Sequence, residues 1–380
     1  MNYTQINISD IESLVQNKTF EQVKQVEGLR VRELDNGSND LKNVYLLVDA
    51  EEETDSPLGI QSNGIILEKE TNNVVCMSQN KFMNIESAEQ GSLIDNLRHT
   101  YSKFRMEYCE DGTVVRLYNY KGVWYTATTK CIDASHSYWS SEKTFDGMFW
   151  EVFGDQTNNL DSSYTYVFIL IHKENRIVVD HKYNNLIYIN RIHNISKVED
   201  YTNHFYSSDP KRSIRRTRQI DSNAIHYPLD DYYHPTKRGI ILKFYNDKLN
   251  NWVIYQYDFS SYTTIKQVRG NVPLIRMRYL ELLQDQVTLQ LLEDNYKESF
   301  FLFAMIKHQM NNLYKEIHNL YFESHIKHNI TVTEDHPFYR TMKQLHGVYK
   351  NTGNPITLEE VKRKVDTLDK NVLRKFLKWV

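Results

Sequence analysis

The sequence predicts an α+β protein in which antiparallel sheets come first and helices follow. Short apolar runs of strand length, separated by turns, extend from about residue 62 to 277. Beyond residue 277 the apolar residues recur at helical spacing instead. Short strands with few helices between them favour antiparallel sheets, and a change of period indicates a change of architecture. We therefore divide the chain into segments 1–61, 62–277 and 278–380.

The first segment is expected to be a helix and strand extension that packs on the core. Residues from Ile8 to Val23 have helical spacing, and the run from Asp35 to Asn39 is a turn cluster. The acidic stretch 49–55 is most simply a surface loop. The N-terminus has no basic region followed by an apolar block, so no secretory signal is expected.

The middle segment is expected to contain the strands. Lys121 and Gly122 lie between two strand-like runs, which indicates a β-hairpin. The predicted strands are Gly64–Glu68, Val74–Met77, Thr113–Tyr120, Val123–Thr128, Tyr164–Ile171, Arg176–Val179, Leu186–Ile189, Gly239–Tyr245 and Trp252–Tyr257.

The last segment is expected to be an all-helical domain. Its predicted helices cover residues 277–292, 298–325 and 338–349, and the run from Asn351 to Pro355 ends the third. Thr357 followed by Glu360 is the pattern of a capping box and predicts the start of another helix. One apolar stripe is expected to belong to the core: Phe300, Phe301, Phe303, Leu313 and Tyr314.

Composition excludes several classes of protein. No apolar run reaches the length of a membrane span, so no membrane contact is expected. Three cysteines (Cys76, Cys109 and Cys131) cannot form a disulfide framework, and without a CxxC pair they predict no metal site. These features favour a cytoplasmic protein. The net charge of -3 gives no overall support for a nucleic-acid partner.

One short segment is strongly basic. Between residues 211 and 218 it carries basic side chains and no acidic one, namely Lys211, Arg212, Arg215, Arg216 and Arg218. Such a run is either a solvated loop or a patch that follows nucleic-acid phosphates. Both interpretations stay open.

Several segments of the middle region occur in a recognisable order. They are Asn63–Glu68 with Lys81–Asn84, Cys109–Gly112, Trp124–Thr128, Tyr166–Val179, Arg238–Ile241 and Trp252–Gln256. Together they resemble the phage-type and fungal-type RNA ligases, which are covalent nucleotidyltransferases. The resemblance implies an antiparallel-sheet nucleotidyltransferase domain, similar to the ATP-grasp-like ligases, over about residues 62 to 282.

The same resemblance implies that the catalytic residues have been replaced. RNA ligases attack the α-phosphate of ATP with a lysine amine, and carboxylates and further lysines hold the metal and the phosphates. In this sequence the nucleophile position is Cys109, the two motif glutamates are Ile169 and Arg238, and the two closing lysines are Ile254 and Gln256. The resemblance therefore predicts no catalytic residue, no metal and no cofactor.

The leading hypothesis is a non-catalytic RNA-ligase-like protein that binds RNA or an RNA end. It would use the former nucleotide cleft and the basic segment. One alternative is a scaffolding protein whose helical domain binds a protein partner, and another is an active ATP-dependent RNA ligase with a relocated nucleophile. The residue usage resembles that of large DNA viruses. The cleft candidates are Lys81, Asp111, Arg116, Arg238 and Lys243.

Overall fold

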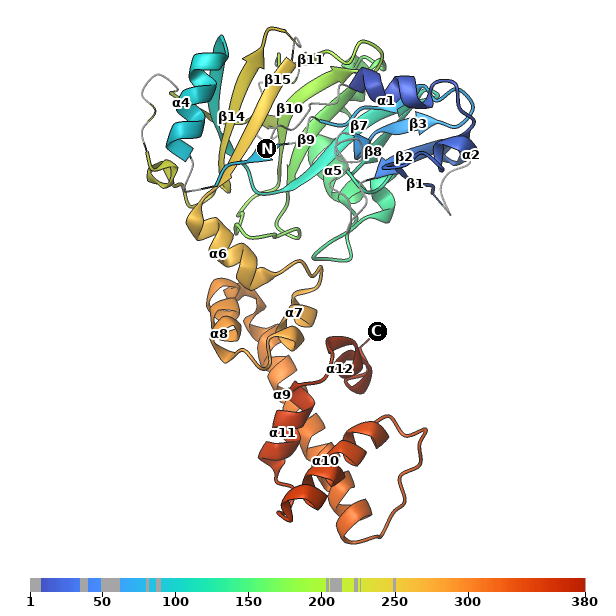
Figure 1. The fold of residues 1–380 in the computed structure, drawn as a ribbon, viewed down its shortest axis with the longest axis vertical. Helices are drawn as coiled ribbons and strands as arrows, with labels where there is room; N and C mark the ends of the chain where they lie inside the picture. The colour runs from blue at the N-terminus through green and yellow to red at the C-terminus, as the bar shows by residue number, and fades with distance from the viewer. Residues whose placement is uncertain are drawn as a thin grey trace. The chain divides into compact units, whose positions relative to one another are not determined.

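The chain divides into two compact units, Met1–Thr263 and Thr264–Val380. The computed structural model describes residues 8–34, 40–48, 62–79, 82–86, 90–202, 205, 214–221, 225, 227–248 and 251–379. Sheets make up most of the first unit and helices make up the second (Figure 1), which confirms the predicted α+β class. The predicted boundary after residue 277 lies inside α7 (Ile275–Glu281). The predicted turn cluster 35–39 and the acidic stretch 49–55 lie outside the described residues.

The described part of the first unit contains three sheets. The first has the strand order β1-β2-β3-β4, the second has β11-β10-β9-β7-β8 with β12 beside β10, and the third has β13-β6-β14-β15-β5. Pairing is antiparallel, as predicted, except between β10 and β12 and between β15 and β5. The strands are β1 Arg30–Arg32, β2 Val44–Val48, β3 Ile66–Glu68, β4 Val74–Cys76, β5 Met83–Asn84, β6 Lys103–Cys109, β7 Thr113–Tyr120, β8 Val123–Ala127, β9 Tyr164–Ile171, β10 Asn185–His193, β11 Glu199–Asp200, β12 Ile214–Arg216, β13 Gln219–Ile220, β14 Gly239–Asn246 and β15 Asn251–Asp258.

The N-terminal residues form two short helices where the sequence predicts one. They are α1 (Ile8–Val15) and α2 (Phe20–Val23), and the second begins at a capping box formed by Thr19 and Gln22. A capping box satisfies backbone N–H groups that a helix start leaves free, so it favours a new helix here. The helices and the first sheet share a small core, and β3 pairs with β2 across the predicted boundary at residue 61.

The second sheet contains the predicted hairpin of β7 and β8. Its turn residues Lys121 and Gly122 have φ values of 52° and 83°. Two successive positive φ angles are typical of a type I′ turn, which matches the twist of the strands that it joins. The outer face of this sheet is covered by α5 (Phe145–Phe153), which the sequence does not predict.

The third sheet is covered on its outer face by α4 (Gln90–Thr100), as Figure 1 shows. Just after that helix, Tyr101 contacts Phe244 of β14 with their ring centroids 5.9 Å apart. The opposite face of the third sheet, here called its inner face, is turned toward Tyr201, which follows β11 of the second sheet. Trp252 of β15 contacts Tyr201 at a centroid distance of 6.3 Å.

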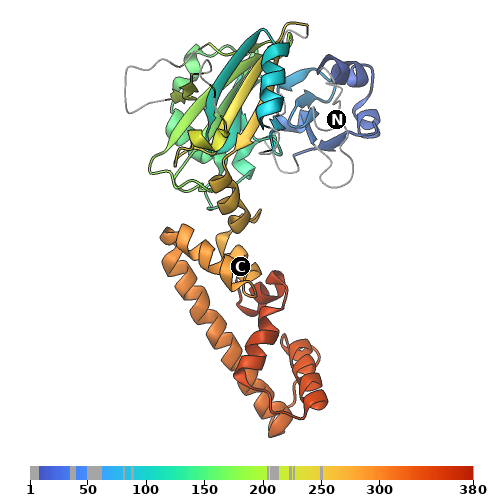
Figure 2. The same ribbon diagram turned by 60° about the vertical axis from the view of Figure 1, so that its left-hand side comes forward.

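The second unit is helical, as predicted. Thr357 and Glu360 form the predicted capping box, with the Thr357 amide donating to Glu360 Oε2 over 2.8 Å. In Figure 2, α9 and α11 lie side by side, and Tyr314 of α9 donates to Asp366. The helices are α7, α8 Gln286–Asn295, α9 Phe300–Tyr321, α10 Tyr339–Thr352, α11 Leu358–Asp366 and α12 Lys370–Phe376, and α6 Ser260–Arg269 spans the division between the units.

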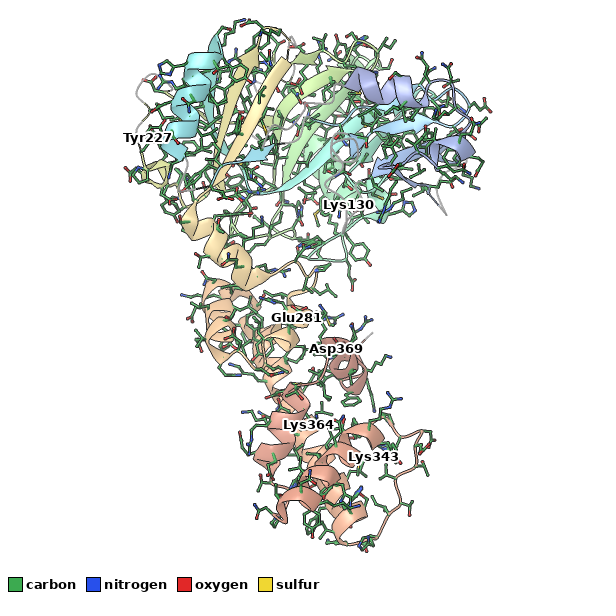
Figure 3. All side chains as sticks on the ribbon, viewed as in Figure 1. Lys130, Tyr227, Glu281, Lys343, Lys364 and Asp369 are labelled. Atoms are coloured by element: carbon green, nitrogen blue, oxygen red, sulfur yellow. The ribbon has the colours of Figure 1, made fainter. Side chains whose placement is uncertain are left out.

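Side chains of the second unit separate into a buried core and an exposed apolar surface. The predicted core stripe is only partly buried: Phe303, Leu313 and Tyr314 are buried, but Phe300 is 65% exposed and Phe301 is 84% exposed. Figure 3 labels Glu281, whose carboxylate forms ion pairs with Arg278 and Lys370. None of the described helices is long and apolar enough to span a lipid bilayer.

Candidate functional site

The inner face of the third sheet brings together positions from three separate motifs. In the register of β6, β14 and β15, Cys109 lies opposite Gly239, and Ile241 lies opposite Gln256. Residues directly opposite one another on antiparallel strands project from the same face. Cys109, Gln256 and Ile254 therefore share this face.

Apolar side chains fill the part of the inner face around Cys109. Cys109, Ile241 and Ile254 form a buried cluster, with Phe82 and Trp252 packed against it. Burial raises the pKa of the Cys109 thiol to about 12, and the positive charge of Arg238 opposes that rise only in part. At neutral pH the thiol is therefore protonated, and a protonated thiol is a poor nucleophile.

Arg238 is held by a carboxylate of the neighbouring strand. Its Nε and Nη2 atoms donate to the two carboxylate oxygens of Asp258, over 2.7 Å and 2.9 Å. Gln256 donates to the same carboxylate over 2.6 Å. Bidentate arginine–carboxylate pairs fix both side chains, so this network joins two of the replaced motif positions into one structural unit.

Asp111 is used to anchor the loop that follows β9. Its Oδ2 atom accepts from the amides of Val178 and Val179 over 2.9 Å and 2.7 Å, and its Oδ1 atom accepts from Tyr262 over 2.7 Å. Residues 176–179 are therefore not the strand that the sequence predicts. The amides of Val178 and Val179 bind the Asp111 side chain. Both oxygens of the carboxylate have protein donors.

Ile169 presents a hydrocarbon surface where the resemblance expects a metal-binding glutamate. It lies on β9 opposite Val114 of β7 and Ile187 of β10, and its side chain is half-buried. A Cβ atom added to Gly112 would lie 2.6 Å from Ile169 Cγ2, so the glycine permits this close approach. Among the described residues, no group of three or more His, Cys, Asp or Glu side chains is placed to hold a metal ion.

Lys243 is buried and paired. Its ammonium group forms an ion pair with Glu107 of β6 and lies 4.6 Å from the ring centroid of Tyr201. Glu107 also accepts from Thr217 over 2.6 Å. A buried charge needs such partners, because removing it from water is otherwise costly. Lys243 therefore has a structural partner where the sequence suggests a contact with phosphate.

Arg116 is buried away from any open surface. It lies on β7 and is 1% exposed. Its guanidinium donates to the backbone carbonyl oxygens of Gly64, Met77 and Thr128. These carbonyls come from three different parts of the first unit, so Arg116 joins the first sheet to the hairpin of the second.

The basic segment passes from the second sheet to the third. Residues 214–216 form β12 beside β10, and residues 219–220 form β13 beside β6. The side chains of Arg215, Arg216 and Arg218 are exposed. Each still contacts a tyrosine: Arg215 lies over Tyr183 and Arg218 over Tyr108, and Arg216 donates to the carbonyl of Tyr201.

Three predicted site residues lie outside the described part of the chain, namely Lys81, Lys211 and Arg212. Conversely, the predicted site residues do not include Glu107, Asp258 or Tyr262, the partners of Lys243, Arg238 and Asp111. A charged side chain needs a partner when it is buried. The sequence does not show which distant residue supplies that partner.

No known protein-family model matches the sequence. It is 25% identical over 232 residues to an immediate-early protein ICP-46 homolog of Invertebrate iridescent virus 3, covering 57% of this chain and 49% of that protein. The homolog of Invertebrate iridescent virus 6 is 22% identical over 266 residues, covering 63% and 57%. The chain thus spans about half the length of these curated relatives.

A third relative is described as a putative bifunctional polynucleotide kinase/RNA ligase of Autographa californica nuclear polyhedrosis virus. It is 28% identical over 142 residues, covering 34% of this chain and 20% of that protein. Similar solved structures include a putative ATP-dependent DNA ligase from Aquifex aeolicus, with a TM-score of 0.43, 12% identity and coverage of 78% and 80%. An archaeal ATP-dependent RNA ligase has a TM-score of 0.41, 11% identity and coverage of 87% and 77%.

The sequence relatives agree with the order of motifs along the chain. The putative kinase/RNA ligase is a viral protein, as are both ICP-46 homologs. The antiparallel sheets place the motif positions from β6, β14 and β15 on one face. The chain thus resembles the RNA ligases in the order of its motifs, and its sequence relatives are viral proteins.

Proposed function

We propose that this protein is a non-catalytic member of the RNA-ligase-like proteins and that it binds RNA through its basic segment. One observation carries the non-catalytic part. The position that needs a lysine amine holds the buried thiol of Cys109, whose pKa is raised to about 12 by burial. The closing-strand positions hold Ile254, which is buried and apolar, and Gln256, which is bound to Asp258. These groups supply neither the amine nucleophile nor the two cations that nucleotidyl transfer uses at these positions.

An active ligase with a relocated nucleophile is a weaker candidate. Lys237 and Lys243 are described lysines close to the motif positions, and each is paired with a buried glutamate, Glu110 and Glu107 respectively. Each ion pair holds its lysine on a carboxylate of the fold, whereas a nucleophile must reach the α-phosphate. This pairing supports binding over catalysis.

The filled inner face favours the basic segment over the former nucleotide cleft as the route for RNA. Cys109, Ile241 and Ile254 already occupy the face around the nucleophile position. Arg215, Arg216 and Arg218 are instead exposed. Exposed cations along an extended strand can follow the phosphates of a nucleic acid without reading its bases.

Reversing two charges of β12 tests this route. We expect Arg215→Glu with Arg216→Glu to weaken RNA binding about tenfold or more for all sequences alike, since phosphate contacts carry no sequence information. The slope of log affinity against log salt should fall by about 1.4, because each lost phosphate contact on single-stranded RNA contributes about 0.7. Fluorescence anisotropy at several salt concentrations measures both quantities.

The matched control reverses two exposed cations of the N-terminal region, Lys18 and Arg30. Lys18→Glu with Arg30→Glu changes the net charge equally and should leave the salt slope nearly as it was. If the wild-type protein binds no RNA at low salt, the RNA-binding function is wrong. If both double variants lose affinity equally, the attraction is a general effect of charge and β12 is not a site.

A scaffolding function is the second candidate, and the exposed rings of α9 favour it. Phe300 and Phe301 stand at the start of this helix, both are exposed, and their ring centroids are 5.6 Å apart. Large exposed apolar side chains that gather in one place often mark a protein interface. In this case the partner would be a protein that the helical unit binds.

A stability measurement tests whether these rings are free to bind a partner. Phe300→Ser with Phe301→Ser should change the free energy of unfolding by about 0.5 kcal/mol or less, as expected for exposed positions. Phe303→Ser, in the same helix but buried, should cost about 3 kcal/mol or more. Urea denaturation followed by circular dichroism compares them. A large loss in the double variant would mean that the rings already pack within the chain.

A further inference from the structure

Two cation–aromatic pairs lie side by side on the inner face of the third sheet, beyond the buried cluster. Lys103 of β6 lies opposite Tyr245 of β14, which lies opposite Trp252 of β15. The Lys103 ammonium is 4.5 Å from the centroid of the Tyr245 ring, and the Arg105 guanidinium is 5.1 Å from that of Trp252. The rings of Tyr245 and Trp252 are 5.2 Å apart. These four residues are here called the cation–aromatic strip.

The strip is accessible, and no described carboxylate forms an ion pair with its two cations. Lys103 and Arg105 are exposed, and Tyr245 and Trp252 are partly exposed. Neither cation has a carboxylate partner among the residues that the structure describes. Lys243, on the same face, is by contrast buried and paired with Glu107. A buried lysine whose charge is paired within the fold thus lies on the same face as two cations whose side chains are exposed to solvent.

This arrangement fits one class of ligand. Proteins that bind single-stranded nucleic acid combine cations that follow the backbone with aromatic rings on which bases stack. A duplex keeps its base faces stacked inside and cannot use such rings. We propose that the cation–aromatic strip binds single-stranded RNA, with bases against Tyr245 and Trp252 and phosphates beside Lys103 and Arg105. The proposal rests on the proposed RNA-binding function. It adds that the RNA is single-stranded and that the strip is the surface of the protein that binds it.

The strip is connected to the basic segment through Tyr201. The ring of Tyr201 is 6.3 Å from that of Trp252, and its carbonyl accepts from Arg216 of β12. The exposed arginines of the second sheet and the strip of the third sheet are therefore linked by one residue. We infer that a strand of RNA that lies along β12 continues past Tyr201 onto Trp252.

The test compares a labelled short oligouridylate, alone and annealed to its complement, by fluorescence anisotropy. We expect the single strand to bind more tightly than the duplex. Lys103→Ala with Arg105→Ala should lower the salt slope for the single strand by about 1.4, from two lost phosphate contacts. Trp252→Leu should weaken single-strand binding about tenfold, and Trp252→Phe should keep most of the affinity, because a ring still offers a stacking surface.

The outcomes separate this proposal from the one on which it rests. Wild-type protein that binds no RNA overturns both. If Arg215→Glu with Arg216→Glu abolishes RNA binding but every strip variant binds like the wild type, the strip proposal alone is overturned. Equal affinity for single strand and duplex also overturns the strip proposal alone. Trp252 packs against the buried cluster, so circular dichroism must show that Trp252→Leu is folded. If Trp252→Leu is not folded, the salt slope of Lys103→Ala with Arg105→Ala decides whether the strip binds RNA.

Discussion

Incubation with magnesium and α-labelled ATP or GTP is expected to leave the protein unlabelled after denaturing electrophoresis. A covalent adduct needs a neutral amine or a thiolate beside groups that spread the charge of the leaving pyrophosphate. Cys109 is buried, and its pKa of about 12 keeps it protonated at neutral pH. An active RNA ligase assayed in parallel shows that labelling works. A labelled wild-type band that disappears in Cys109→Ala would contradict the non-catalytic function.

Restoring the nucleophile alone should not restore labelling. Cys109→Lys introduces a longer side chain into the cluster with Ile241 and Ile254, and overpacking a filled core costs about 1 to 3 kcal/mol. The new amine would also lack a metal-binding carboxylate at Ile169 and lysines at 254 and 256. Catalytic groups that act as a unit are strongly non-additive, so one restored member recovers little.

The informative comparison is the variant in which all five positions are restored together. It carries Cys109→Lys, Ile169→Glu, Arg238→Glu, Ile254→Lys and Gln256→Lys. We expect lower stability in this variant, since Arg238→Glu also leaves Asp258 facing a second carboxylate in place of its guanidinium partner. Labelling of Cys109→Lys alone would mean that residues assigned here to the fold supply the phosphate and metal contacts.

Local signals in the sequence predict much of the fold. The turn at Lys121 and Gly122, the strand Tyr164–Ile171 and the capping box at Thr357 are all present as predicted. Each depends on residues within a few positions of one another. Turn chemistry, alternation and helix capping are properties of short segments, so they can be recognised without knowing what packs against them.

The predicted strands omit β6, although its alternation of charged and apolar residues is a strand pattern. What the sequence alone does not reveal is how its charged face is held in the fold. Lys103, Arg105 and Glu107 alternate there with apolar residues, and Glu107 is buried only because Lys243 of β14 pairs with it. That pairing depends on a contact between distant strands, which periodicity cannot reveal. The helices α4 and α5 are missed for a related reason: each is short, and each is held by a sheet face that it covers.

The candidate site is predicted in its positions but not in its contacts. Three of the motif positions, Cys109, Ile254 and Gln256, lie on one face of the third sheet. The order of motifs does not show that Asp258, 20 residues away in the chain, neutralises Arg238, or that Tyr262, 151 residues away, binds Asp111. Whether a charged residue is free for a ligand depends on such partners, and they follow from the tertiary structure.

Arg116 has the clearest change of role, and its replacement should have the largest effect on stability. Removing the guanidinium leaves the buried carbonyls of Gly64 and Met77 without this donor, while the Thr128 carbonyl still accepts from the Cys131 amide. Each unsatisfied buried carbonyl costs about 1 to 3 kcal/mol, so we expect Arg116→Met to lower the free energy of unfolding by about 4 kcal/mol. Arg116→Lys should lose less, because an ammonium still donates but does not have the span of the guanidinium.

Urea denaturation followed by circular dichroism measures this loss, with Arg30→Met as the control. Arg30 lies on β1 and is exposed, so its replacement should change the free energy of unfolding by about 0.5 kcal/mol or less. The RNA affinity of Arg116→Met is measured as well, because it distinguishes a phosphate contact from a structural role. If Arg116→Met is as stable as the wild-type protein and has lost RNA binding, then Arg116 contacts phosphate as the sequence first suggested. If stability falls and the remaining folded protein binds RNA normally, the three carbonyls are its only essential partners among the described residues.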